Sequence, residues 1–455
     1  MKILVTGATG LVGRHLVRRL LDTGHEVVAL SRNVGDAEVS LPVRCLVHEW
    51  RPGAGQMDAS ALDSVEGVVH LAGESVGEGR FDLAHKDAIA KSRIEGTRAL
   101  VTAIAARPAT DRPRVLVAAS ATGFYGERGD EELDETSTAG SGFLADVCRA
   151  WESESRRVET AGLRWVALRT GLVLARDGGA LERLLPIFRL GLGGSLGGGK
   201  QWMNWIHVED LVSLYIAALE NPAWEGPVNA VAPQPIRNRE FSKALGRALG
   251  RPAVLPAPAF ALRAVLGQKA NLLLESQRVF SQAAADTDFP FDYPDLASAL
   301  SELCADLSKV FEMEMWLDRR PEEVFPFFAD ARNLETITPS FLGFRILQAP
   351  PDSVHEGALL EYRIRLHGVP LRWRTRIDVW DPPRTFVDTQ LKGPYKSWRH
   401  THDFEPLDGG TLVRDIVRYE LPFGALGDIV AGRFVERDVA LIFAYRRTRL
   451  LELFA

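Results

Sequence analysis

The chain has 455 residues, which is long enough for two or three domains, because a single hydrophobic core seldom grows beyond about 250 to 300 residues. Its 54 basic and 60 acidic side chains leave a formal net charge of −6, spread evenly along the sequence, which argues against nucleic-acid and membrane-surface partners. The three cysteines lie far apart without metal-ligand spacing, and we find neither a signal peptide nor an apolar run that spans a bilayer, so we expect a cytoplasmic protein.

The first thirteen residues predict a strand, a glycine turn and the start of a helix. The run 2–5 is apolar, as a strand covered on both faces of a parallel sheet requires. Gly7 permits a tight turn, Gly10 lets the backbone approach a pyrophosphate, and Gly13 lets the helix pack on the strand. The helix expected over 11–23 directs its free amides toward an anion. Because a second strand follows, this order favours a dinucleotide site over an ordinary glycine-rich turn.

The end of that second strand, expected over 26–30, decides which nicotinamide cofactor fits. In an NAD site an Asp or Glu accepts a hydrogen bond from the ribose 2′-hydroxyl, whereas the 2′-phosphate of NADP needs cations and hydroxyl donors. This chain places Ser31 and Arg32 there. We therefore predict NADP, and the alternative is that Arg32 is only a solvated surface residue.

Apolar strands and helical segments alternate over the next hundred residues. Strands are expected over 44–49, 67–73 and 114–120, and a long helical repeat separates the last two. Strands that alternate with helices require right-handed crossovers, which place the strands in a parallel, doubly wound sheet. The predicted fold class of this half is therefore α/β.

The chain resembles the extended short-chain dehydrogenases/reductases in four motifs: Thr6–Gly13, His70–Gly73, Ser120–Gly126 and Arg169–Leu174. The segment 193–210 narrows the resemblance to the atypical, epimerase-like branch of the NAD-dependent epimerase/dehydratase family. This similarity extends to about residue 300, and its last part, 252–300, resembles the branch's C-terminal domain of unknown function.

The resemblance implies a Rossmann sheet that binds NADP at the carboxyl ends of its strands. The cofactor residues that it implies are Thr6, Gly7, Thr9, Gly10, Leu11, Val12, Gly13, Ser31, Arg32, Leu71, Ala72, Gly73, Arg93 and Ser120.

Catalysis in the resembled family uses a Tyr-x-x-x-Lys pair and a Ser or Thr that orients the substrate carbonyl. Ser120 matches the hydroxyl position and Thr122 is a nearby substitute, but Phe143 and Val147 stand where the pair belongs. Tyr125 is a candidate replacement acid, with a packing role as the alternative. We favour an NADP-dependent oxidoreductase or epimerase-like enzyme acting on a small carbonyl or hydroxyl substrate. The alternative is a module that binds NADP(H) without turnover.

A glycine-rich stretch, 191–199, predicts a mobile substrate lid. The residues after it face the substrate in the resembled family. They imply substrate contacts by Lys200, Trp202, Asn204 and His207, whereas Asp210 is expected to cap a helix or anchor a hydrogen bond.

The pattern changes after residue 300. A helix over 301–309 is expected to close the first part, and a strand over 311–317 with strict alternation opens the second. A short helix from Pro321, a run of antiparallel strands and a long final helix over 425–454 follow, which is an α+β helix-grip layout. We place the domain boundary between residues 305 and 306.

The second part resembles the START-like (SRPBCC, polyketide cyclase/dehydrase) superfamily in three motifs: Pro321–Phe328, Ile377–Pro383 and Gly393–Trp398. Such domains fold a sheet around the last helix and leave a cavity for an apolar ligand. Alternation predicts that the cavity is lined by Leu360, Tyr362, Ile364, Leu366, Leu371, Trp373, Thr375 and Ile377.

Two polar patterns in this part have a simple and a functional interpretation. The opposite strand faces carry five arginines, which are expected to form a solvated face in preference to an anion or partner patch. His400 and His402 share a face with Trp398 and Phe404, and a His-x-His pair on one strand can bind a metal. Because the sequence argument supplies no third ligand, polar anchors within the cavity are favoured and no metal is predicted.

Overall fold

The computed structural model describes residues 1–53, 57–349 and 353–455. The chain divides into two compact units. Unit 1 holds residues 1–37 and 44–306, and unit 2 holds residues 307–455 together with the short segment 38–43. No helix in the described part of the chain combines the length and the apolar character that a membrane span requires.

Unit 1 is built on a seven-stranded sheet in the order β11-β7-β5-β4-β1-β2-β3, and all of its strand pairs are parallel. This confirms the predicted doubly wound α/β fold. The strands are β1 Lys2–Thr6, β2 Glu26–Ser31, β3 Cys45–Glu49, β4 Gly67–His70, β5 Val115–Ala121, β7 Arg164–Thr170 and β11 Gly226–Ala230.

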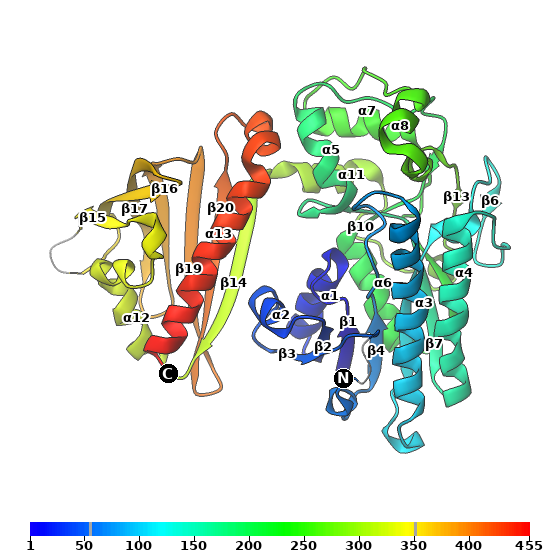
Figure 1. The fold of residues 1–455 in the computed structure, drawn as a ribbon, viewed down its shortest axis with the longest axis horizontal. Coiled ribbons are helices and arrows are strands. Elements are labelled where there is room, and N and C mark those ends of the chain that lie inside the picture. The colour runs from blue at the N-terminus through cyan, green and yellow to red at the C-terminus, as the bar shows by residue number, and fades with distance from the viewer. Residues whose placement is uncertain (54–56, 350–352) are drawn as a thin grey trace. The chain divides into compact units, whose positions relative to one another are not determined.

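Helices cover both faces of this sheet, with α1 packed beside α6 and α3 beside α4 (Figure 1). The crossover helices are α1 Leu11–Asp22, α2 Val34–Ser40, α3 Leu83–Ala105, α4 Phe143–Arg156 and α6 Val208–Glu220. β1 lies between β2 and β4, so the chain winds outward in both directions from this strand. In open α/β sheets the ligand binds outside the carboxyl ends of the strands at such a switch point.

Small elements of unit 1 extend beyond the carboxyl ends of these strands. They form three two-stranded pairs, β10 with β8, β12 with β9 and β13 with β6, and several short helices. Their bounds are β6 Glu132–Leu133, β8 Leu172–Ala175, β9 Trp202–Met203, β10 Trp205–His207, β12 Ile236–Arg237, β13 Arg278–Val279, α5 Gly179–Arg189, α7 Asn238–Ala248, α8 Ala259–Leu266, α9 Asn271–Leu274, α10 Gln282–Asp286 and α11 Leu296–Ala305.

Unit 2 contains an antiparallel seven-stranded sheet in the order β14-β20-β19-β18-β17-β16-β15, and a long helix, α13, packs against it (Figure 1). Val439, Phe443 and Leu450 of α13 join the core formed with β14 and β20. This confirms the predicted helix-grip layout. Its elements are β14 Lys309–Leu317, α12 Pro321–Ala329, β15 Arg345–Gln348, β16 Leu359–Leu366, β17 Val369–Asp381, β18 Thr385–Lys392, β19 Ser397–Leu407, β20 Gly410–Glu420 and α13 Ala425–Leu453.

The helix predicted over 301–309 is wrong in its bounds. α11 begins at Leu296, where the side chain of Asp295 accepts hydrogen bonds from two first-turn amides, and it ends at Ala305. Lys309 already belongs to β14, where it pairs with Tyr419. The capping aspartate is the local signal that marks the true start of this helix.

Candidate functional site

The glycine turn of unit 1 leaves no room for side chains. Gly7 has φ +69°, and a Cβ on it would lie 2.8 Å from the amide nitrogen of Ala72, while a Cβ on Gly13 would lie 2.2 Å from the carbonyl oxygen of Gly7. Gly10 precedes α1 and supplies no capping side chain. Thr9 and Gly10 are exposed. The turn therefore presents the uncapped amides of a helix N-terminus, as a pyrophosphate site requires.

A series of buried, hydrogen-bonded side chains links the ends of β1 and β4 behind this turn. Thr6 Oγ1 lies 2.7 Å from His70 Nδ1 and accepts a hydrogen bond from the amide of Ala72, and His70 Nε2 lies 2.9 Å from Thr97 Oγ1. Burial lowers the pKa of His70 to about 4, and nearby Arg93 acts in the same direction. His70 is therefore neutral near pH 7, and it orders the predicted cofactor residues Thr6, Leu71 and Ala72.

Arg93 places a positive charge beside Gly73. A Cβ on Gly73 would lie 3.2 Å from the Arg93 guanidinium carbon. The guanidinium donates to the carbonyl of Glu74 at 2.8 Å and covers the ring of Trp151 at 5.0 Å. The structure thus brings two predicted cofactor residues together at the carboxyl end of β4.

The end of β2 carries one predicted cation and gains a second from Arg51, which follows β3. Ser31 Oγ donates to the carbonyl of Asn33, and Arg32 is exposed. Arg51 Nε donates to the carbonyl oxygen of Arg32 at 3.3 Å, which brings a second guanidinium to this position. Sequence reasoning missed Arg51, because the pairing of β3 with β2 is what places it beside Arg32.

Ser120 lies at the end of β5 and donates to Glu152 Oε1 at 2.6 Å. Arg169 holds that carboxylate through two hydrogen bonds of 2.9 Å, and all three side chains are buried. Glu152 follows the positions of the missing pair on α4, where Phe143 and Val147 carry no polar group. The sequence analysis did not single out Glu152 or this ion pair.

Tyr125 is completely buried in the core. Its hydroxyl donates to Asn229 Oδ1 at 2.7 Å, and Arg169 donates to it at 3.0 Å. Burial raises the pKa of Tyr125 to about 12. This burial agrees with the alternative packing role of Tyr125, and its role as a replacement acid stays a prediction. Thr122, also buried, lies in the 3-10 turn Thr122–Tyr125.

The four predicted substrate residues have different surroundings in the structure. Lys200 is exposed, and Trp202 donates to Asp130 at 2.8 Å and lies against the guanidinium of Arg237. Asn204 is buried, and its side-chain oxygen accepts from the amide of Val279. Asn204 therefore links two backbone segments, and its predicted contact with a substrate stays a prediction.

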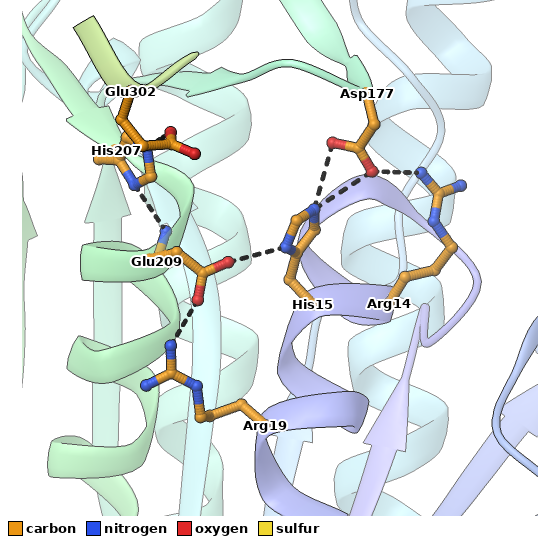
Figure 2. Close-up of polar contacts among 7 residues, drawn as sticks. All are labelled: Arg14, His15, Arg19, Asp177, His207, Glu209 and Glu302. Atoms are coloured by element: carbon orange, nitrogen blue, oxygen red, sulfur yellow. Dashed lines mark hydrogen bonds and ion pairs between the residues drawn. The ribbon is translucent and has the colours of Figure 1, made fainter. Parts of the chain in front are cut away.

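His207 is a helix cap. Its Nδ1 accepts from the amide of Glu209, its Nε2 lies 3.1 Å from Glu302, and its ring stacks on Tyr293, so that only 1% of the residue is exposed (Figure 2). These internal contacts hold the His207 ring in place, and its predicted contact with a substrate stays a prediction. Asp210 accepts from the amides of residues 292 and 293, which confirms its predicted role as a hydrogen-bond anchor.

In the lid predicted over 191–199, two glycines lie where close packing leaves no room for a side chain. A Cβ on Gly193 would lie 2.5 Å from the ring of Phe188, and a Cβ on Gly194 would lie 2.1 Å from the carbonyl oxygen of Leu255. The glycine content of this stretch predicted mobility. In the structure, Gly193 and Gly194 are required because a side chain at either position would clash with its neighbours.

A charged network joins the glycine-turn helix to its surroundings (Figure 2). His15 of α1 contacts Glu209 of α6 through Nδ1 at 3.0 Å, and its Nε2 lies 3.2 Å from Asp177. Arg19 binds Glu209 at 2.6 Å, and Arg14 binds Asp177 at 3.3 Å. Burial lowers the pKa of His15, but the two carboxylates outweigh it and raise the pKa to about 9.

Unit 2 contains a largely apolar cavity of about 170 Å³. Seven of the eight predicted cavity residues line it, Leu371 being the exception, and His400 and His402 line it as well. The five arginines on the opposite faces are exposed, and Arg376 and Arg372 pair with Asp378 and Glu361. This pairing agrees with the solvated-face interpretation.

Three family models match the chain in sequence order. Residues 3–231 match the NAD dependent epimerase/dehydratase family, residues 257–303 match a domain of unknown function (DUF1731), and residues 317–443 match the polyketide cyclase/dehydrase and lipid transport family.

Individual relatives match unit 1. An Arabidopsis thaliana protein described as the chloroplastic homologue of epimerase family protein SDR39U1 is 41% identical over 307 residues, which cover 66% of this chain and 86% of the relative. Human SDR39U1, solved with NADPH, superposes with a TM-score of 0.60 at 33% identity and covers 68% of this chain and 100% of its own. Since the plant relative is chloroplastic, a cytoplasmic location stays a prediction for this chain.

A nucleoside-diphosphate sugar epimerase from Corynebacterium glutamicum superposes with a TM-score of 0.54 at 34% identity. The match covers 67% of this chain and 59% of the bacterial one.

The charged network predicts a pH-dependent stability of unit 1. Because the pKa of His15 is raised from its ordinary 6.5 to about 9, its charged form stabilises the folded state fully below about pH 6.5 and not above pH 9. His15→Gln should lose roughly 1–3 kcal/mol of unfolding free energy at pH 6 and little at pH 9.5. Denaturant unfolding across this range measures the difference. Equal losses at both pH values would contradict the prediction. Asp177→Asn removes one of the two carboxylates that raise the pKa of His15, so the loss of stability with rising pH should occur at lower pH in this variant.

Proposed function

The chain belongs to the NAD-dependent epimerase/dehydratase family, and from this premise we propose that residues 1–305 bind NADP and act on a small carbonyl or hydroxyl substrate. Residues 306–455 hold an apolar ligand. The observation that carries the proposal is the glycine turn, where Gly7 and Gly13 exclude any Cβ and α1 begins without a capping side chain. The relative solved with NADPH supports the choice of cofactor.

The residues around the turn fit the charges of NADP. The amides of residues 9–13 would hold the pyrophosphate, because they lie at the positive end of the α1 dipole. Arg32 and Arg51 would pair with the 2′-phosphate. The segment 71–73 and Arg93 would border the rest of the nucleotide. When bound, NADP supplies hydride transfer to or from a substrate carbon.

Ser120 is the group that we propose orients the substrate oxygen. Its hydroxyl donates to Glu152 in the structure, and in that position its lone pairs would accept a hydrogen bond from a substrate hydroxyl, whereas rotation of the hydroxyl would turn its proton toward a substrate carbonyl oxygen. Arg169 fixes the direction of that carboxylate. Thr122 is the second hydroxyl of this region, and the proposal assigns it a supporting position.

A second candidate function is cofactor binding without turnover. It is favoured by Phe143 and Val147, which replace the proton-transferring pair of the family with groups that cannot carry a proton. Under this alternative, unit 1 binds NADP(H) as a sensor or scaffold and unit 2 carries its ligand independently. The two candidates differ in one measurable respect, because only the enzyme consumes NADPH.

The cofactor proposal predicts that Arg32→Ala loses the preference for NADPH over NADH. Removal of a charge-assisted contact to the 2′-phosphate should weaken NADPH binding roughly ten- to hundredfold and leave NADH binding nearly unchanged. Fluorescence titration with each nucleotide measures both constants. Arg44→Ala, which alters another exposed arginine near the opposite end of the neighbouring strand, serves as the control. A wild-type chain that prefers NADH would defeat the proposal.

The enzyme proposal predicts that Ser120→Ala loses activity without losing cofactor. Across a panel of small carbonyl compounds, the wild-type chain should oxidise NADPH, and the variant should be slower by a factor of about 10² to 10⁴ with unchanged NADPH affinity. Ser60→Ala, which removes an exposed hydroxyl elsewhere in unit 1, should behave as wild type. If the wild-type chain binds NADPH but consumes none with any compound, the binding module is the correct function.

The ligand proposal predicts a co-purified apolar molecule. Native mass spectrometry of the full chain should show an added mass that organic extraction removes. Ile364→Trp fills the cavity and should abolish the added mass, whereas Val379→Trp, on an exposed face of β17, should retain it. An added mass that survives Ile364→Trp would place the ligand elsewhere.

A further inference from the structure

Three adjacent strands of unit 2 bring two histidines and two aspartates together at the cavity. In the sheet register His400 of β19 is opposite Asp388 of β18, and His402 of β19 is opposite Asp415 of β20. His400, His402 and Asp415 are buried, and Asp388, with His400 and His402, lines the cavity. Three of these four groups are buried in an apolar domain, and the fourth, Asp388, is half-buried at the cavity wall, so the cluster favours a compensating charge or ligand.

Three of these side chains offer ligand atoms at coordination spacing. Asp388 Oδ2 lies 3.5 Å from His400 Nδ1 and 3.4 Å from His402 Nε2, and all three atoms lie within 4.8 Å of one another. A tetrahedral ion with bonds of about 2.0–2.1 Å separates its ligand atoms by roughly 3.3 Å. Small side-chain shifts are therefore enough to close this triad around one ion.

The fourth side chain, Asp415, contacts the ring nitrogens of both histidines that do not contact Asp388. Asp415 Oδ1 forms a hydrogen bond of 2.8 Å with His400 Nε2. It also lies 2.8 Å from His402 Nδ1, but that nitrogen has no hydrogen-bond partner of good geometry among the described residues, so a small rotation of the ring would complete this second contact. Metal-bound histidines usually give their second N–H to a carboxylate, which fixes the ring and its tautomer. Asp415 is fully buried, and its other carboxylate oxygen has no hydrogen-bond partner among the described residues.

The charges of the cluster leave a place for a cation. Arg446 of α13 lies 3.9 Å from Asp415 and offsets its charge. Among the described residues, the ion pairs of Asp388 are with the two imidazoles alone. Either a proton on an imidazole or a metal ion must balance this carboxylate, and a metal uses all three ligand atoms at once.

We propose that Asp388, His400 and His402 bind a divalent transition-metal ion, with Asp415 as the carboxylate that orients both histidines. Two imidazoles and one carboxylate favour Zn²⁺ and similar ions over Mg²⁺ and Ca²⁺. Two phenylalanine rings would form an apolar wall around the ion. The ring centroid of Phe386 lies 4.0 Å from that of His402, and the ring centroid of Phe443 lies 5.2 Å from that of His400. The remaining coordination position faces the cavity, where an oxygen atom of an otherwise apolar ligand completes the site.

The direct test is metal binding by the full chain, purified without a histidine tag and freed of metal with a chelator. Titration with Co²⁺ should give visible absorption bands of a low-symmetry site that saturate at about one equivalent, and Zn²⁺ should displace them. Elemental analysis of the reloaded protein gives the stoichiometry independently. A wild-type chain that binds neither ion overturns the proposal, whatever its variants do, and leaves a protonated imidazole as the balancing charge.

Variants locate the ion. Asp388→Asn and His402→Gln should each weaken binding by about a hundredfold or more, whereas Asp415→Asn should weaken it about ten- to a hundredfold and keep one site at saturation. His355→Gln, which alters an exposed histidine of the same unit, should bind as wild type. Circular dichroism checks that each variant is folded. If folded Asp388→Asn binds Co²⁺ as tightly as wild type, or His355→Gln loses the site, the assignment is overturned.

Discussion

The close approach of the glycine turn to the end of β4 is the contact on which unit 1 depends. The turn lies against the backbone of residues 71 and 72, and Gly13 lies against the turn itself, so any side chain at Gly7 or Gly13 would separate β1, α1 and β4. The Thr6–His70–Thr97 chain fastens the same corner with buried hydrogen bonds. One steric constraint thereby creates both the packing of the sheet and the exposed amides of a dinucleotide site.

The polar groups near the expected reaction centre mostly bind one another. Ser120, Glu152, Arg169, Tyr125 and Asn229 form a continuous buried network, and each member has partners in the fold. Such networks are stable only when fully satisfied, because an unpaired buried polar group is costly. The positions of the family's proton-transferring pair are occupied here by Phe143 and Val147, which carry no polar group, so the proposed enzyme would depend on Ser120. This is the physical reason that cofactor binding and turnover are separate questions here.

Unit 2 combines an apolar cavity with a compact charged group at its wall. Side chains alternate along β16 and β17, so apolar residues line the cavity on one face of the sheet and arginines are exposed to solvent on the other. Three neighbouring strands then place imidazole and carboxylate groups on the inner face. The cavity thus offers both apolar surface and a polar end, an arrangement suited to a ligand that carries one polar group on an apolar body.

The features that were predictable before folding are those that depend on neighbours along the chain. Strand alternation, helical periodicity and the spacing of Gly7, Gly10 and Gly13 predicted the doubly wound sheet, the helix-grip domain and the cavity face, because these patterns repeat every two to four residues. Tertiary structure alone decided the partners of polar side chains. His15 meets Asp177 across 162 residues, and Asp388 meets His402 across 14. The internal partners of His207 and Asn204, Glu302 and Val279, are likewise far away in the sequence, so only the folded chain brings them together.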